Sequence, residues 1–93
     1  GGQLKEQGTA HWSNTNGGLN NNESGFTAFG SGYRDCCSSG GFDALRYYGF
    51  FWSASPSGGS AWCRLLDYHY GYAGVYRDGN DPRYGFAIRC ARD

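Results

Sequence analysis

The segment YYGFFWSAS, residues 47–55, limits the possible folds more than any other part of the sequence, because only Gly49 interrupts its aromatic residues. Aromatic side chains favour pleated, half-buried strands, and a short apolar run bounded by turn residues predicts a buried strand. Glycine accounts for 17 of the 93 residues, and no long helical periodicity is visible. We therefore expect an α+β fold that is β-dominated and loop-rich, and we exclude an all-helical one.

The chain length predicts a single domain over residues 1–93. A chain of this size buries only roughly 60 to 65% of its unfolded surface, so it needs large side chains or covalent cross-links. Eight Tyr, six Phe and three Trp supply large side chains. The residues that we expect in the core, because each lies in an apolar block, are Trp12, Trp52, Trp62 and Phe86.

The carboxy-terminal half predicts an antiparallel meander. Three strand candidates follow the aromatic run, namely AWCRLLDYHY, GVYR and RYGFAIRC. They are separated by GYA and by DGNDP, and the latter is a strong turn signal with Pro82 at its end. By contrast, the polar run SNTNGGLNNNES predicts a loop, because Asn and Gly readily adopt turn conformations.

Charge and hydropathy exclude two classes of partner. The formal charge is zero, from eight basic and eight acidic residues, and no segment gathers basic residues into a phosphate-binding surface. We expect no nucleic acid partner. No apolar run approaches the roughly 20 residues that span a bilayer, so we expect no membrane span, and any targeting segment is removed or lies outside this sequence.

The four cysteines indicate an oxidising compartment, since an even number in a small, glycine-rich chain is typical of disulfides. Zinc is the competing interpretation, but no C-x-x-C pair or nearby His completes a set of four ligands. A direct bridge between neighbours is strained. We therefore expect two disulfides in which Cys36 or Cys37 pairs with Cys63 or Cys90.

A row of tyrosines is the main candidate for a binding site. Tyrosines recur at every second residue in LLDYHYGYAGVY, and a strand would place them on one face. Exposed rings would bind a sugar or a protein, with neighbouring polar groups as hydrogen-bond partners. The alternative is that the rings pack against other strands in a small core. The candidate ligand-binding residues are Asp67, Tyr68, Tyr70, Tyr72, Arg77 and Asn80.

From Leu4 to Asp93 the chain contains, in order, the blocks LKEQGTAHW, NESGFTAFGSGYR, YGFFWSAS, AWCRLL, GVYR and YGFAIRCARD. In this order they resemble the Fibrobacter succinogenes major paralogous domain, a family of exported and often lipid-anchored bacterial proteins. The resemblance implies a C-type lectin-like fold, which is also found in formylglycine-generating enzymes and in receptor-binding proteins of phages.

The resemblance covers only the carboxy-terminal part of the family pattern. Members usually carry an amino-terminal half with a C-P-x-G-W-H-x-P segment, which is missing here. We therefore expect a truncated domain. The family pattern would join Cys90 to the missing segment, and the other three cysteines stand where members commonly have other residues. An incomplete sheet with open edges would favour association with copies of the same chain.

Catalysis and metal binding find little support. Enzymes need a nucleophile beside a base, or two apposed carboxylates, and the sequence contains no such motif. His11 and His69 are far apart in the chain and lack a nearby Cys or a second His. The runs Asn20–Glu23 and Asp78–Asp81 offer oxygens for calcium. However, the E-P-N and W-N-D motifs of calcium-dependent lectins of this fold are absent, so we favour polar turns.

These observations predict a protein that is not an enzyme, has no cofactor, and is secreted or displayed on the cell surface. We expect a ligand-binding module of the C-type lectin-like type that recognises a carbohydrate or a protein. The alternative is a structural subunit of a surface assembly or filament, which associates with its own copies. Similarity of fold does not choose between them.

Overall fold

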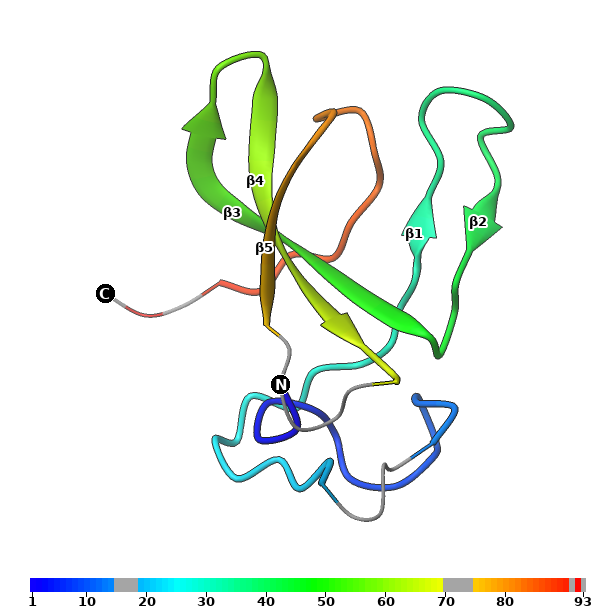
Figure 1. The fold of residues 1–93 in the computed structure, drawn as a ribbon, viewed down its shortest axis with the longest axis vertical. Coiled ribbons are helices and arrows are strands. Elements are labelled where there is room, and N and C mark those ends of the chain that lie inside the picture. Colours follow the sequence, from blue (N-terminus) through cyan, green and yellow to red (C-terminus); the bar gives the residue numbers. More distant parts are fainter. Residues whose placement is uncertain (15–18, 70–74, 91, 93) are drawn as a thin grey trace.

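The computed structural model describes residues 1–14, 19–69, 75–90 and 92. Its strands are β1 (Tyr33–Arg34), β2 (Phe42–Asp43), β3 (Tyr48–Ser57), β4 (Ser60–Asp67) and β5 (Tyr76–Asn80). Strands β3, β4 and β5 form one antiparallel sheet in that order, and β1 and β2 form a second, two-stranded one. Residues 1–14 and 19–30 form loops at one end of the larger sheet (Figure 1). The described residues contain no helix, so the β-dominated prediction is confirmed and the α component is not seen.

The predicted antiparallel meander is confirmed, but the first and third expected strands differ from the observed ones, and β5 continues through Asp78–Asn80 of the segment DGNDP, which was expected to be a turn. Strand β4 ends at Asp67 because the Asp67 side chain accepts a hydrogen bond of 2.8 Å from the backbone N–H of His69, which turns the chain. The expected strand RYGFAIRC forms only two isolated bridges, Arg34 with Gly85 and Phe51 with Ala87. The predicted tyrosine row therefore begins outside the strand that was expected to carry it.

Strand β3 presents two different faces, because alternate residues of a strand point to opposite sides. Tyr48, Phe50 and Trp52 lie on one face, opposite Asp67, Leu65 and Cys63 of β4. Gly49 and Phe51 lie on the other face, toward the amino-terminal loops. The aromatic run is thus divided between two faces of the strand. The face with Gly49 and Phe51 is the core face. The face with Tyr48, Phe50 and Trp52, called the second face below, is left uncovered by the amino-terminal loops.

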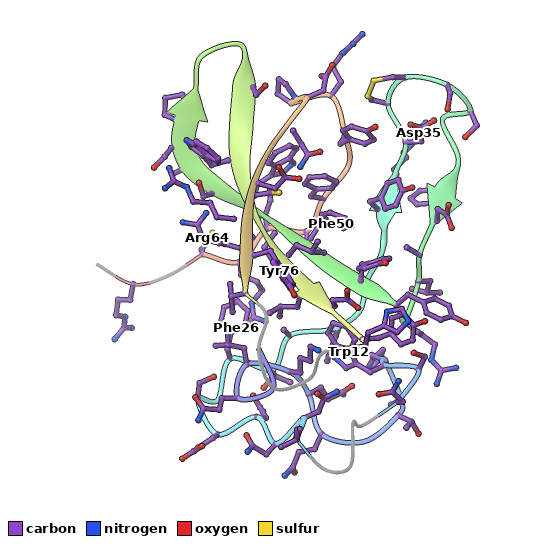
Figure 2. All side chains as sticks on the ribbon, viewed as in Figure 1. Trp12, Phe26, Asp35, Phe50, Arg64 and Tyr76 are labelled. Carbon is purple, nitrogen blue, oxygen red and sulfur yellow. A yellow bond between two sulfur atoms is a disulfide. The ribbon has the colours of Figure 1, made fainter. Side chains whose placement is uncertain are left out.

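Trp12 is the centre of the core and is fully buried. Its indole Nε1 donates a hydrogen bond of 2.8 Å to the carbonyl of Ala28, and its ring lies against Gly49 and Leu66 of the sheet. Figure 2 shows Trp12 where the amino-terminal loops meet the end of the sheet. Leu4, Phe26, Phe51 and Tyr68 pack around this cluster while partly exposed.

The other three residues expected in the core are only partly buried, so that expectation is wrong for them. Trp62 lies on the face of the sheet where the guanidinium of Arg77 stacks over its ring, 3.9 Å from the ring centre. Trp52 and Phe86 lie against each other with ring centres 4.3 Å apart on the second face of β3. Large aromatic rings in a chain this small fill surface hollows as well as the core.

Lys5 is also fully buried, which is unusual for a charged side chain. Its ammonium lies 4.8 Å from the centre of the Trp12 ring and donates a hydrogen bond to the backbone carbonyl of Asp67. Burial lowers the pKa of Lys5, and the Asp67 carboxylate opposes that shift. Lys5 therefore ties the amino-terminal loops to the end of β4 at the cost of desolvating a charge.

The disulfide differs from the expected pairing. Cys36 is joined to its neighbour Cys37, and Cys63 and Cys90 are free thiols. Cys63 is buried on β4, where its Sγ accepts a hydrogen bond of 3.3 Å from the Asn80 amide, whereas Cys90 is exposed. The expected bridges are not formed, because the adjacent pair lies at the turn between β1 and β2 while Cys63 is enclosed in the larger sheet.

The close approach of the Phe29 carbonyl to Gly49 predicts that a methyl group at position 49 destabilises the fold. A Cβ there would lie 2.7 Å from the carbonyl oxygen of Phe29 and 3.5 Å from the Trp12 ring. We expect Gly49→Ala to lower the free energy of unfolding by about 1 to 3 kcal/mol, the usual cost of overpacking. Gly59→Ala is the matched control because open space surrounds that position. Equal stability of the two variants in urea denaturation would contradict this packing.

The buried ammonium predicts a pH-dependent stability. The pKa of Lys5 is lower in the folded chain than its unfolded value of about 10.4, so the unfolded chain binds more protons between the two values. The destabilisation from Lys5 is therefore complete below its folded pKa and fades as the pH rises from that pKa toward the unfolded value. Relative to Lys5→Met, which cannot titrate, the wild type should become more stable over this range. Tyrosine titrations are common to the wild type and the variant, so they cancel in the difference between the two unfolding free energies. A difference that does not change with pH would contradict a lowered pKa of Lys5.

Candidate functional site

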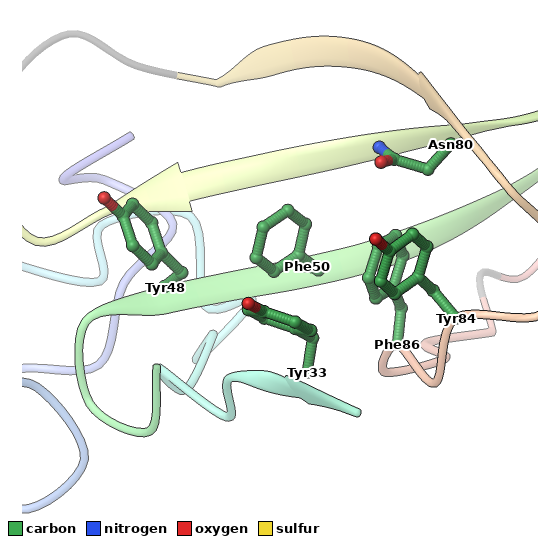
Figure 3. A pocket seen from close by; sticks show the side chains of 6 residues that line it. All are labelled: Tyr33, Tyr48, Phe50, Asn80, Tyr84 and Phe86. Atoms are coloured by element: carbon green, nitrogen blue, oxygen red, sulfur yellow. The ribbon is translucent and has the colours of Figure 1, made fainter. Parts of the chain in front are cut away.

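An aromatic cleft on the second face of β3 is the candidate functional site. It has a volume of about 280 Å³, near the lower end of the roughly 300–1,000 Å³ typical of small-molecule sites. Its lining combines three phenols, two phenyl rings and one amide. The lining residues, shown in Figure 3, are Tyr33, Tyr48, Phe50, Asn80, Tyr84 and Phe86.

Strand β3 supplies the floor of the aromatic cleft. Tyr48 and Phe50 are two residues apart and therefore point to the same side of the strand. The ring of Phe50 stacks on Phe86 with ring centres 4.6 Å apart and planes 19° apart. Tyr84 continues the stack, 5.6 Å from Phe86 and inclined by 14°. The result is a row of nearly parallel rings beside the strand.

Backbone hydrogen bonds hold the segment that carries Tyr84 and Phe86 between the two sheets. The N–H and carbonyl of Gly85 bond to the carbonyl and N–H of Arg34 at 3.0 and 2.9 Å. Ala87 bonds in the same way to β3, donating to Phe50 and accepting from Trp52 at 3.0 and 3.1 Å. A Cβ at Gly85 would lie 2.9 Å from the Cβ of Arg34, so the close approach requires glycine. The rings are therefore positioned by main-chain pairing.

Tyr33 of β1 forms the side of the cleft. Its ring meets Phe50 and Tyr84 edge-on, with ring centres 5.5 and 6.0 Å apart. Asp43 is its partner across β1 and β2 and hydrogen-bonds its side chain. Desolvation, reinforced by Asp43 and Asp35, raises the pKa of Tyr33, so this phenol stays neutral at physiological pH.

Asn80 places an amide at the opposite side of the cleft. It is the last residue of β5 and pairs with Ala61 of β4, which puts its side chain on the face of Phe50. Its Nδ2 donates to the Sγ of Cys63 at 3.3 Å and to the Asp78 carboxylate at 3.4 Å. These contacts orient the amide beside the aromatic rings.

A second hollow of about 300 Å³ adjoins the cleft, since Tyr33 and Tyr48 line both. Tyr68 lies in this second hollow, with its ring 4.7 Å from that of Tyr47 and nearly perpendicular to it. Desolvation, followed by the neighbouring Tyr47, raises the pKa of Tyr68. Asn80 lines only the aromatic cleft, and Tyr68 lines only the second hollow.

The candidate residues from the sequence are only partly brought together. Asn80 lines the cleft and Tyr68 lines the second hollow. Asp67 uses its carboxylate to hold the bend at His69. Arg77 stacks on Trp62, on the opposite face of the sheet from Asn80. Tyr70 and Tyr72 lie outside the described residues.

Sequence reasoning missed four residues of the cleft and placed Phe86 in the core. The alternation of Tyr48 and Phe50 with Gly49 and Phe51 was a usable signal, because it places the Tyr48 and Phe50 rings together on one side of a strand and Phe51 on the other. No local sequence pattern identifies Tyr33 and Tyr84 as cleft residues, because they reach the cleft through pairing between segments far apart in the chain.

The oxygens considered for calcium accept local hydrogen bonds from the backbone, Asn21 and Asn22 in loops and Asp78 within β5. Asn21 and Asn22 accept hydrogen bonds from the backbone N–H groups of Glu23 and Thr27 at 3.0 and 2.8 Å. Asp78 accepts one from Gly79 at 2.9 Å. This is the usual role of Asn and Asp side chains in loops.

Comparison with known proteins gives one match. A family model described as the Fibrobacter succinogenes major domain matches residues 1–92. No curated protein and no solved structure matches the chain. In the described part of the chain, no helix has the length and apolar character needed to cross a bilayer.

Proposed function

Because the chain belongs to the Fibrobacter succinogenes major domain family, we propose that it is a secreted or cell-surface module that binds a carbohydrate in the aromatic cleft. The observation that carries this proposal is the stacked row of Phe50, Phe86 and Tyr84 beside neutral hydrogen-bonding groups. We further propose that the domain has the C-type lectin-like architecture implied by the sequence blocks. The Cys36–Cys37 disulfide is consistent with an oxidising, extracellular location.

The chemistry of the cleft suits a sugar better than an ionic ligand. A pyranose ring offers a C–H face that packs on an aromatic plane, and its hydroxyls both donate and accept hydrogen bonds. Phenol and amide groups also do both, which matches them to hydroxyls. None of the six lining side chains is ionised at neutral pH by its residue type, so no fixed charge selects an ion.

The shape of the site favours an extended ligand. The aromatic cleft is small for a complete ligand, but it continues into the second hollow through Tyr33 and Tyr48. We propose that one sugar unit stacks on the rings of the cleft and that neighbouring units reach toward Tyr68. An oligosaccharide should therefore bind more tightly than its monosaccharide.

Substitution of Tyr84 tests the proposal. On a glycan array, Tyr84→Ala should reduce binding of the saccharides that the wild type captures, with a loss of about 1 kcal/mol or more in affinity for a ring at the centre of a site. Tyr84→Phe keeps the stacked ring and should retain most of the affinity. Tyr76→Ala is the matched control, because Tyr76 is an exposed tyrosine of β5 outside the aromatic cleft.

Thermal unfolding of each variant separates lost binding from lost folding. The proposal fails if the wild type captures no saccharide, or if Tyr84→Ala and Tyr76→Ala bind equally well. If Tyr84→Ala unfolds at a much lower temperature, Tyr84→Phe and Tyr33→Phe serve instead, since each removes only a hydroxyl. Unchanged affinity in both would then exclude hydrogen bonding by the phenols.

The second candidate is a structural subunit that associates through β5. Within the described residues, β5 pairs only with β4, which leaves its other edge without a strand (Figure 1). Such an edge is a template for pairing with another chain. However, Arg77 and Asp78 are exposed on β5, and charged side chains disfavour pairing between edges. The outer edge of β3 is partly covered by bridges to Gly32 and Ala87.

Sedimentation distinguishes this second candidate. A subunit that assembles through β5 should form species larger than the 10.2 kDa chain at micromolar concentration. Tyr76→Pro would alter the pairing with β4 as well, so Asp78→Lys is the better probe because it reverses an exposed charge of β5. The Asp78 carboxylate also accepts a hydrogen bond from Asn80, so this variant is compared by sedimentation alone. A single monomeric species in the wild type would exclude the assembly.

A further inference from the structure

The turn that connects β1 to β2 is an ordered platform for its two cysteines. The backbone N–H of Asp35 donates to the carbonyl of Gly41 at 2.8 Å and closes the turn. The Asp35 carboxylate accepts hydrogen bonds from the backbone N–H groups of Cys37, Ser38 and Ser39 at 3.3, 3.0 and 2.7 Å. Figure 2 shows Asp35 beneath the turn and the disulfide at its end. The backbone on both sides of the cysteines is thus fixed independently of the disulfide.

A carboxylate from a distant part of the chain faces this pair. Asp81 follows β5, and its Oδ2 lies 3.9 Å from the Sγ of Cys37. The ligand atoms of Cys36, Cys37 and Asp81 all lie within 4.8 Å of one another. Hydrogen bonds from Arg83 lower the pKa of Asp81 to about 2, so its carboxylate is ionised at neutral pH. The aromatic cleft uses none of these three side chains.

We propose that the reduced forms of Cys36 and Cys37, together with Asp81, bind one thiophilic divalent cation of the zinc class. Tetrahedral coordination with a Zn–S distance of about 2.3 Å and a Zn–O distance of about 2.0–2.2 Å requires a sulfur and an oxygen about 3.6 Å apart. The observed 3.9 Å between Cys37 and Asp81 is close to that separation. Two soft thiolates and one carboxylate are a ligand set that zinc accepts, and water completes it.

The disulfide makes this site dependent on redox state. In the oxidised chain both sulfurs are engaged in the S–S bond and cannot act as thiolates. A dithiol reductant breaks that bond, supplies two electrons and two protons, and itself becomes a cyclic disulfide. The cation then displaces the two thiol protons as the S–metal bonds form. The exposed Arg83 side chain keeps its contact with Asp81 or moves into solvent without cost to the core.

The remaining cysteines define the background for a test. Burial raises the pKa of the Cys63 thiol, which keeps it protonated and a poor ligand. Cys90 is exposed and is removed by Cys90→Ser. The probe is Cd²⁺ alone, because its bonds to thiolates give an ultraviolet charge-transfer absorption, followed by competition with Zn²⁺. The protein is reduced with a dithiol and desalted without oxygen before titration.

Reduced Cys90→Ser should show the charge-transfer band saturating at one Cd²⁺ per chain, and Zn²⁺ should remove the band. The oxidised protein and the double variant Cys36→Ser/Cys37→Ser should show none. Asp81→Asn should weaken Cd²⁺ binding by about tenfold or more, since even a partner outside the ligand shell costs that much. Asp78→Asn is the matched control, because it removes a neighbouring acidic charge outside the cluster.

Several results would overturn the proposal. They are the absence of a band in the reduced protein, an equal band in the oxidised protein, and equal affinity of the Asp81→Asn and Asp78→Asn variants. Binding of one Cd²⁺ by two chains, seen as a dimer in sedimentation, would also overturn it. Circular dichroism of each reduced variant establishes that the strands are intact, so that a lost band reports lost ligands.

Discussion

The burial of Trp12 against Gly49 is the contact on which the rest of the structure depends. The indole lies in van der Waals contact with position 49, where a Cβ would be 3.5 Å from the ring, and its N–H is satisfied by the carbonyl of Ala28. This contact joins the amino-terminal loops to the larger of the two sheets seen in the described residues. It also covers one face of β3 and so leaves the rings of the other face available to the aromatic cleft.

Much of the sheet could be predicted from the sequence, because local patterns determine it. Aromatic residues and turn signals predicted the meander of β3, β4 and β5. The end of β4 could not be predicted from propensity, since the side chain of Asp67 bonds to the backbone of His69 and turns the chain. The core was overestimated because a Trp in an apolar block can also lie under a guanidinium, as Trp62 does under Arg77.

The candidate site was less predictable, because part of its lining depends on contacts between segments that are far apart in the sequence. Asn80 and Tyr68 were identified as polar and aromatic groups near turns, and each lies in one of the two adjoining hollows. The remaining wall comes from Tyr33 and Tyr84, which meet only because main-chain bridges join their segments to each other and to β3. Such long-range pairing leaves no periodic trace in a single sequence. The disulfide was mispredicted because nothing in the sequence indicates that Cys63 is enclosed within the sheet.

The division of β3 between two faces has an evolutionary consequence. Substitutions at Gly49 and Phe51 alter the packing of the core, whereas substitutions at Tyr48 and Phe50 alter the lining of the aromatic cleft, where we propose that the ligand binds. The residues of β3 on one face can therefore change during evolution while those on the other face stay the same. A gene that duplicates such a domain can acquire new specificities by changing the outward residues of a single strand, without having to discover a new fold each time.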